Sequence, residues 1–123
     1  MNLASEIISA FPKIQSQPIN EEFIELNENI MELAGEIDLF HYLPAYMLWC
    51  LKHQDKKLID LHTVNALAEY GRTKMKENNH LNFKWRCTQT QKSVVIKFLE
   101  WCLVEIPSLD EKQLERAIRN WKK

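Results

Sequence analysis

Apolar residues recur at the three- and four-residue spacing of a helix through most of this chain. The first run covers residues 2–11 and stops at Pro12, because proline lacks a backbone donor and clashes with the preceding turn. A second run begins at Asn20, a typical N-cap, and reaches Gly35, a typical helix end. We therefore expect a helix over residues 20–35.

The predicted helix 20–35 separates its polar and apolar sides. Its apolar stripe contains Phe23, Leu26, Ile30, Leu33 and Ala34. The opposite stripe is acidic and contains Glu21, Glu25, Glu28, Glu32 and Glu36. An acidic stripe of this kind is most often a solvated helix face. The alternative is a partner-binding face that presents spaced negative charges to a cationic protein, as inhibitors of nucleases often do.

The stretch "FHYLPAYMLWCLKHQ" (residues 40–54) predicts a central helix. Proline is best tolerated at the first position of a helix, so Pro44 should begin it, with Leu43 at the cap and the end near His53. Residues 47–51 are apolar in every direction, which is typical of a helix surrounded by protein.

The pattern between Leu58 and Ala68 predicts another helix, with Gly71 as its break or cap. Residues 78–87 have mixed periodicity and turn-prone asparagines, and we expect a long loop there with a short extended piece. Two capping boxes then predict the starts of two C-terminal helices, Thr88 with Gln91 and Ser108 with Glu111, and Pro107 ends the first of them.

Composition favours the same fold class. The chain has 123 residues, 46% of them hydrophobic and 27% charged, and only two glycines, too few for an all-β fold with many tight turns. We predict one all-α domain over residues 1–123, a compact irregular bundle of five or six short helices around a buried central helix at about 44–53.

Charge is distributed unevenly along the chain. Residues 1–61 carry ten acids and four bases, a net charge of −6, whereas residues 62–123 carry seven acids and twelve bases, a net charge of +5. Such a chain either packs its two halves together or offers two differently charged surfaces to partners.

Nothing in the sequence predicts export or membrane insertion. The N-terminus has no basic lead followed by an apolar run, and no stretch approaches 18 uninterrupted apolar residues. The three cysteines include no Cys-x-x-Cys pair. We therefore expect a reduced, cytoplasmic protein that does not act at a membrane.

Motifs of enzymes and cofactor sites are absent, and we predict no catalytic residue and no cofactor. One arrangement leaves an alternative open. Cys50 and His53 are one helical turn apart and, with His41 or His62, could form a metal site or a thiolate–imidazole pair. The ordinary interpretation is a buried cysteine beside a histidine at the polar end of a core helix.

A basic segment with aromatic residues covers residues 72–92 and contains Lys84, Trp85 and Arg86. Charge and stacking together can bind nucleic acid. The pI of about 6.4 is far from that of a dedicated nucleic-acid binder, so an acidic protein partner, or the chain's own acidic half, is the favoured interpretation.

Two stretches resemble a family of uncharacterised small bacterial proteins. The first is Leu43–Tyr46, which matches a Leu-Pro-Ala-Tyr segment. The second is a later helix of the form Thr-x-x-Gln-x-x-x-Val-x-x-Phe-Leu-Glu, matched here by Thr88, Gln91, Val95, Phe98, Leu99 and Glu100. This chain departs from the family at Cys87–Thr90, where a Leu-Thr-Pro start is usual. The resemblance implies a fold but no catalytic residues, because the family has no established activity.

These features together predict a non-catalytic protein-binding module of a bacterial cytoplasm. One concrete version is a toxin-neutralising immunity protein whose acidic helix face docks on a basic toxin. The alternatives are a small metal-binding protein or enzyme that uses Cys50 and His53, and a weak nucleic-acid binder that uses residues 72–92. The sequence leaves the oligomeric state open.

Overall fold

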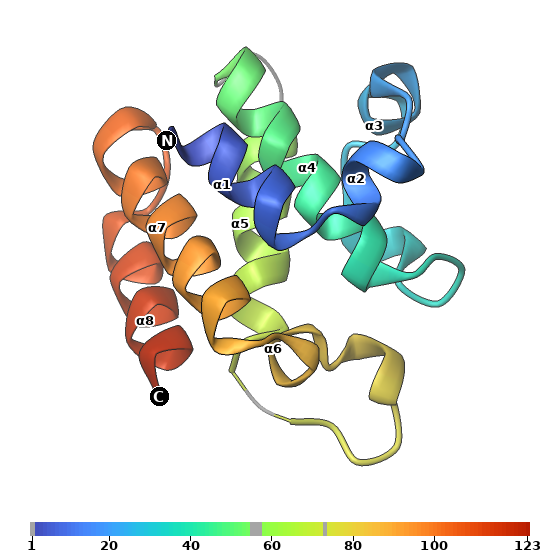
Figure 1. The fold of residues 1–123 in the computed structure, drawn as a ribbon. Helices are drawn as coiled ribbons and strands as arrows, with labels where there is room; N and C mark the ends of the chain where they lie inside the picture. The colour runs from blue at the N-terminus through green and yellow to red at the C-terminus, as the bar shows by residue number, and fades with distance from the viewer. Residues whose placement is uncertain (1, 55–57, 73) are drawn as a thin grey trace.

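The computed structural model describes residues 2–54, 58–72 and 74–123 (Figure 1). Within these ranges the chain forms eight α-helices, two 3₁₀-helices and no strand, which confirms the predicted all-α class with more helices than the five or six expected. In chain order they are α1 (Leu3–Ala10), α2 (Lys13–Ser16), α3 (Glu21–Leu26), η1 (Ile30–Leu33), α4 (Leu39–His53), α5 (Ile59–Glu69), η2 (Asn79–Leu81), α6 (Phe83–Arg86), α7 (Gln89–Glu105) and α8 (Glu111–Lys122).

The long helices pack as a bundle. In it, α4 packs against the N-terminal helices and α5 packs against the C-terminal helix α8. Helices α7 and α8 form an antiparallel hairpin, α1 packs on α7, and α5 packs on α8 (Figure 1). Helix α4 contacts α5 on one side and α1, α2 and α3 on others. None of the helices in the described part of the chain is long and apolar enough to cross a bilayer.

Helix α4 is the buried central helix, but it begins five residues earlier than predicted. The carboxylate of Asp38 caps it by accepting a hydrogen bond from the Phe40 backbone nitrogen. Arg86 fixes this extra turn, because its guanidinium pairs with Asp38 and lies 4.5 Å from the Phe40 ring centre. Pro44 therefore lies inside the helix, where it removes only the hydrogen bond to the Phe40 carbonyl.

The core consists mainly of the inner faces of α4, α5, α7 and α8. On α4 the buried residues are Leu39, Leu43, Pro44, Ala45, Tyr46, Met47, Trp49 and Cys50. Aromatic rings extend this core from one end of the chain to the other, since Phe83 lies 6.1 Å from Phe11 and 5.8 Å from Trp121 between ring centres. The buried Phe83 sits in α6, so residues 78–87 form short helices rather than the expected loop with an extended piece.

The predicted helix 20–35 is wrong as a single helix. Asn20 caps its start as expected, but α3 ends at Leu26 and the chain resumes as η1. The buried Tyr46 hydroxyl donates a hydrogen bond to the Asn27 carbonyl at 2.7 Å, and the Asn27 side chain donates to the Phe23 carbonyl at 2.8 Å. These two bonds hold the backbone of Asn27 in a non-helical conformation and end the helix there.

The C-terminal hairpin confirms one predicted capping box and corrects the other. Thr88 and Gln91 form both bonds of the box that starts α7. Helix α8 starts from Asp110 instead of Ser108, because the Asp110 carboxylate accepts hydrogen bonds from the backbone nitrogens of Lys112 and Gln113. The connection through Pro107 is therefore two residues longer than predicted.

Candidate functional site

The end of α3 divides the five predicted binding glutamates into separate groups. Glu21 and Glu25 remain on α3, where hydrogen bonds connect them to α4. Glu28 and Glu32 line a groove beyond the end of α3. Glu36 is exposed in the turn that follows η1. The structure therefore contains no continuous acidic helix face in this region.

The groove lies between the end of α3, η1 and the start of α5. Its volume is about 280 Å³, and it is lined by Leu26, Asn27, Glu28, Asn29, Glu32, Leu33, Leu58 and His62. We refer to these eight residues as the Leu26–Leu58 groove. Three separate segments supply its walls, so its shape depends on the break at Asn27.

Two leucines of this groove are unusually exposed. Leu26 is 76% exposed and Leu58 is 60% exposed, and the part of the chain that the structure describes has only two other exposed large apolar side chains, Trp85 and Val104. The sequence pattern placed Leu26 in the core stripe, and this prediction is wrong. Because α3 is only six residues long, it buries Ile24 and leaves Leu26 in solvent.

The rim of the groove is anionic. Among the described residues, no ion pair involves Glu28 or Glu32. Within the described residues, neither charge is paired with a Lys or Arg in the way that Asp38 is paired with Arg86. The groove combines an apolar centre with two unpaired carboxylates, a combination that suits a partner with an apolar side chain flanked by cations.

Glu21 and Glu25 have different surroundings from the glutamates of the groove. Glu21 Oε2 lies 3.2 Å from the Lys52 ammonium and 3.4 Å from His53 Nε2, and Trp49 Nε1 donates a hydrogen bond to Glu25 Oε2 at 3.2 Å. Partial burial of Glu21 opposes ionisation, but the hydrogen bonds from Lys52 and His53 outweigh it and lower the pKa of this carboxyl. These two glutamates connect α3 to the last turns of α4.

Cys50 and His53 do not share a site. Cys50 is fully buried, and burial together with the nearby Asp60 carboxylate raises the pKa of its thiol well above the ordinary value. The His53 ring instead packs on Trp49, with 4.5 Å between ring centres. Within the described residues, no cluster of three potential metal ligands includes Cys50.

The other three histidines lie on different elements of the structure, His41 on α4, His62 on α5 and His80 on η2. His41 Nε2 is 2.7 Å from the Gln17 carbonyl oxygen, His62 lines the Leu26–Leu58 groove, and His80 is exposed in η2. None of them belongs to a cluster of three potential metal ligands in the described part of the chain. The geometry therefore gives no support to a thiolate–imidazole pair.

The predicted basic and aromatic residues of α6 have three different surroundings. Lys84 is only 6% exposed, and its ammonium donates a hydrogen bond to the Asn120 carbonyl at 2.6 Å, near the C-terminal end of α8. Burial and two nearby lysines lower its pKa. Arg86 pairs with Asp38, and Trp85 is partly exposed. Lys84 is thus a helix-capping residue, which its place in a basic stretch did not indicate.

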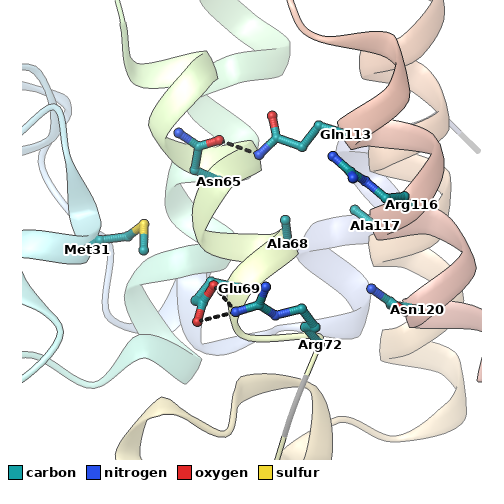
Figure 2. A pocket seen from close by; sticks show the side chains of 9 residues that line it. All are labelled: Met31, Asn65, Ala68, Glu69, Arg72, Gln113, Arg116, Ala117 and Asn120. Carbon is teal, nitrogen blue, oxygen red and sulfur yellow. Dashed lines mark hydrogen bonds and ion pairs between the residues drawn. The ribbon is translucent and has the colours of Figure 1, made fainter.

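A larger cleft of about 500 Å³ lies between α5 and α8 and is closed on one side by Met31 (Figure 2). Most of its polar groups already bond to one another. Gln113 Nε2 donates to Asn65 Oδ1 at 2.6 Å, and Arg72 forms an ion pair with Glu69 at 3.0 Å. These internal bonds leave fewer polar groups free to bind a ligand. The cleft is therefore a weaker candidate for a binding site than its volume indicates.

Comparison with known families identifies the family of this chain. A family model described as a family of unknown function, DUF6714, matches residues 8–123. This chain belongs to DUF6714. No curated protein and no solved structure matches it significantly. Membership of DUF6714 confirms the expected resemblance to a family without an established activity, and it supplies no functional residues.

The DUF6714 match includes every residue of the Leu26–Leu58 groove and of the Glu21–Glu25–His53 region. Neither arrangement follows from a sequence motif. The one available signal was the Asn27-Glu28-Asn29 triplet, because asparagine favours turns and caps over helix interiors. That triplet marks the break, but it does not show which leucines the break exposes.

Proposed function

We propose that this protein is a non-catalytic binding module that docks a protein partner on the Leu26–Leu58 groove. The observation that carries the proposal is the pair of exposed leucines beside the unpaired carboxylates of Glu28 and Glu32. Protein interfaces commonly place apolar anchors at the centre and charged groups at the rim. The matching partner presents an apolar side chain between lysines or arginines.

This proposal narrows the binding surface that the sequence indicated. Glu21 and Glu25 already bond to Lys52, His53 and Trp49. Glu36 does not line the groove. Glu28 and Glu32 are therefore the members of the acidic set that we assign to partner binding. The rim charges accelerate association with a basic partner, and the leucines slow its dissociation.

A toxin-neutralising immunity protein of a bacterial cytoplasm is the concrete form of this function that we favour. Such a protein needs a stable scaffold and a preformed anionic surface, and it needs no catalytic group. The buried α4 and the preformed groove fit these two requirements. A basic toxin or nuclease is the class of partner that this chemistry matches.

The test compares two double variants with the same change in net charge. Glu28→Lys/Glu32→Lys reverses the rim of the groove, and Glu105→Lys/Glu115→Lys reverses two exposed glutamates of α7 and α8. A partner cross-linked to the native chain in its source cells is identified by mass spectrometry and purified. Its affinity for each variant is then measured by calorimetry at low and high salt.

We expect the rim variant to bind at least about tenfold more weakly, equivalent to about 1.4 kcal/mol, because two attractions become repulsions. The control variant should bind like the native chain, and native binding should weaken with salt. Equal affinities for the two double variants would show that the groove is not the docking surface.

A further inference from the structure

Three metal-ligating side chains from two helices converge beside α4. Glu21 and Glu25 are four residues apart on α3, so they share one face, and His53 reaches them from the last turn of α4. The ligand atoms of these three residues all lie within 4.8 Å of one another. An imidazole from a second helix distinguishes this group from a pair of neighbouring surface carboxylates.

The separations within the group suit a transition-metal ion. Glu21 Oε2 and His53 Nε2 are 3.4 Å apart. Two ligands that each lie about 2.1 Å from a tetrahedral zinc ion are separated by about 3.4 Å. A carboxylate oxygen of Glu25 lies within 4.8 Å of the other two ligand atoms, so the group offers three ligands to one ion.

Trp49 holds two of the three ligands in place. Its indole nitrogen donates a hydrogen bond to Glu25 Oε2 at 3.2 Å, and its ring packs on His53 with 4.5 Å between ring centres. Trp49 is itself 3% exposed, so the side chain that orients both ligands is fixed by the core. Metal sites rely on this kind of outer support to orient their ligands.

We propose that Glu21, Glu25 and His53 form a binding site for a divalent cation of the zinc class. One imidazole with two carboxylates favours zinc over magnesium and calcium, which prefer all-oxygen ligand sets. The Lys52 ammonium lies 3.2 Å from Glu21 Oε2, where it competes with a cation for this carboxylate. Its side chain is 62% exposed, so it can move into solvent at the small cost of a surface ion pair.

This site shares no residue with the proposed docking groove, because Glu28 and Glu32 take no part in it. It also differs from a site built on Cys50, whose buried thiol is not part of the cluster. The occupied site joins α3 to α4. Metal binding should therefore stabilise the segment that forms one wall of the groove.

Calorimetric titration of zinc chloride into the untagged, metal-free full chain tests the proposal. We expect one zinc ion per chain and no measurable binding of magnesium chloride under the same conditions. Glu25→Gln and His53→Gln should each weaken zinc binding at least about tenfold, since each removes one of three ligands. Lys52→Ala should strengthen binding, because it removes the competing ammonium.

Two controls keep the result specific. Glu22→Gln changes an exposed glutamate of the same helix and should leave zinc affinity unchanged, as should Cys50→Ser. Circular dichroism establishes that each variant is folded. The proposal fails if the native chain takes up no zinc, or if folded Glu25→Gln and His53→Gln bind zinc as the native chain does.

Discussion

Gly71 follows α5 at a point where the Trp121 indole lies against the backbone. A Cβ atom at this position would overlap the indole nitrogen and the two ring carbons beside it. That nitrogen donates a hydrogen bond to the Leu67 carbonyl at 2.9 Å, so the ring cannot move away without breaking a buried bond. Glycine is required here because there is no room for a Cβ atom, and not because of the backbone conformation.

Replacing Gly71 by alanine should therefore destabilise the protein. We expect Gly71→Ala to lower the free energy of unfolding by about 1–3 kcal/mol, the usual cost of overpacking. Gly35→Ala is the matched control, because Gly35 is exposed and a Cβ there has no neighbour within 4 Å. Urea denaturation of both variants measures the difference, and equal stabilities would contradict the packing seen around Trp121.

Single residues also show where sequence reasoning stops. The spacing of apolar residues indicated that Gly71 ends a helix, but nothing local indicated that Trp121, fifty positions later, lies against it. The same applies to Lys84, whose ammonium bonds to a carbonyl of α8. The need for glycine at position 71 and the burial of Lys84 both depend on contacts between residues that are distant in sequence, which a local sequence pattern does not reveal.

At the scale of elements, most helix ends that are set locally were predicted well, although the local cap of α8, Asp110, was missed. The first helix, the capping box of α7 and the proline after α7 all depend on residues within one turn of the helix end. The start of α4 depends on the local cap Asp38 and on its partner Arg86, and the end of α3 depends on Tyr46. Both of these boundaries were predicted wrongly, and at each of them a contact from another element contributes.

The candidate sites follow the same division. The sequence identified the glutamates, but it grouped them on one helix face that the fold does not form. Because α3 ends at Leu26, Glu21 and Glu25 bond to side chains of α4, whereas Glu28 and Glu32 line the Leu26–Leu58 groove. The exposed leucines were missed for the same reason, since a continuous helix would have buried Leu26.

At the scale of the whole molecule, the unequal charges of the two halves are partly paired inside the fold. Asp38–Arg86 and Glu6–Lys97 each join the acidic first half to the basic second half, at 3.0 Å and 2.7 Å. Glu28 and Glu32 remain outside such pairs in the described structure. In the part of the chain that the structure describes, the fold thus neutralises part of its charge asymmetry and leaves the two glutamates of the groove unpaired.

Stability should depend on pH through Glu21 and Asp38. Partial burial opposes their ionisation, but hydrogen bonds from Lys52 and His53 to Glu21, and from Arg86 and the Phe40 backbone to Asp38, lower both pKa values. A lowered folded pKa contributes stability that is present above the ordinary values of 4.5 and 3.8 and is lost as pH falls through the folded values.

The double variant Glu21→Gln/Asp38→Asn tests this dependence, because both replacements keep the shape of the side chain and remove its charge. We expect the native chain to be more stable than the variant at about pH 6, with the difference shrinking as pH falls below the ordinary pKa values of 4.5 and 3.8. Urea denaturation at several pH values measures the difference. A stability gap that stays constant with pH would rule out this role for the two carboxylates.

Both the docking groove and the separate grouping of Glu21 and Glu25 depend on the break in the chain at Asn27. The most direct test is a set of ¹³Cα chemical shifts for residues 21–35, measured by NMR on the native protein. Helical shifts should extend from Glu21 to Leu26, disappear over residues 27–29 and return for Ile30–Leu33. Uninterrupted helical shifts from Glu21 to Gly35 would contradict the account, because they would return all the glutamates to one face and Leu26 to the core.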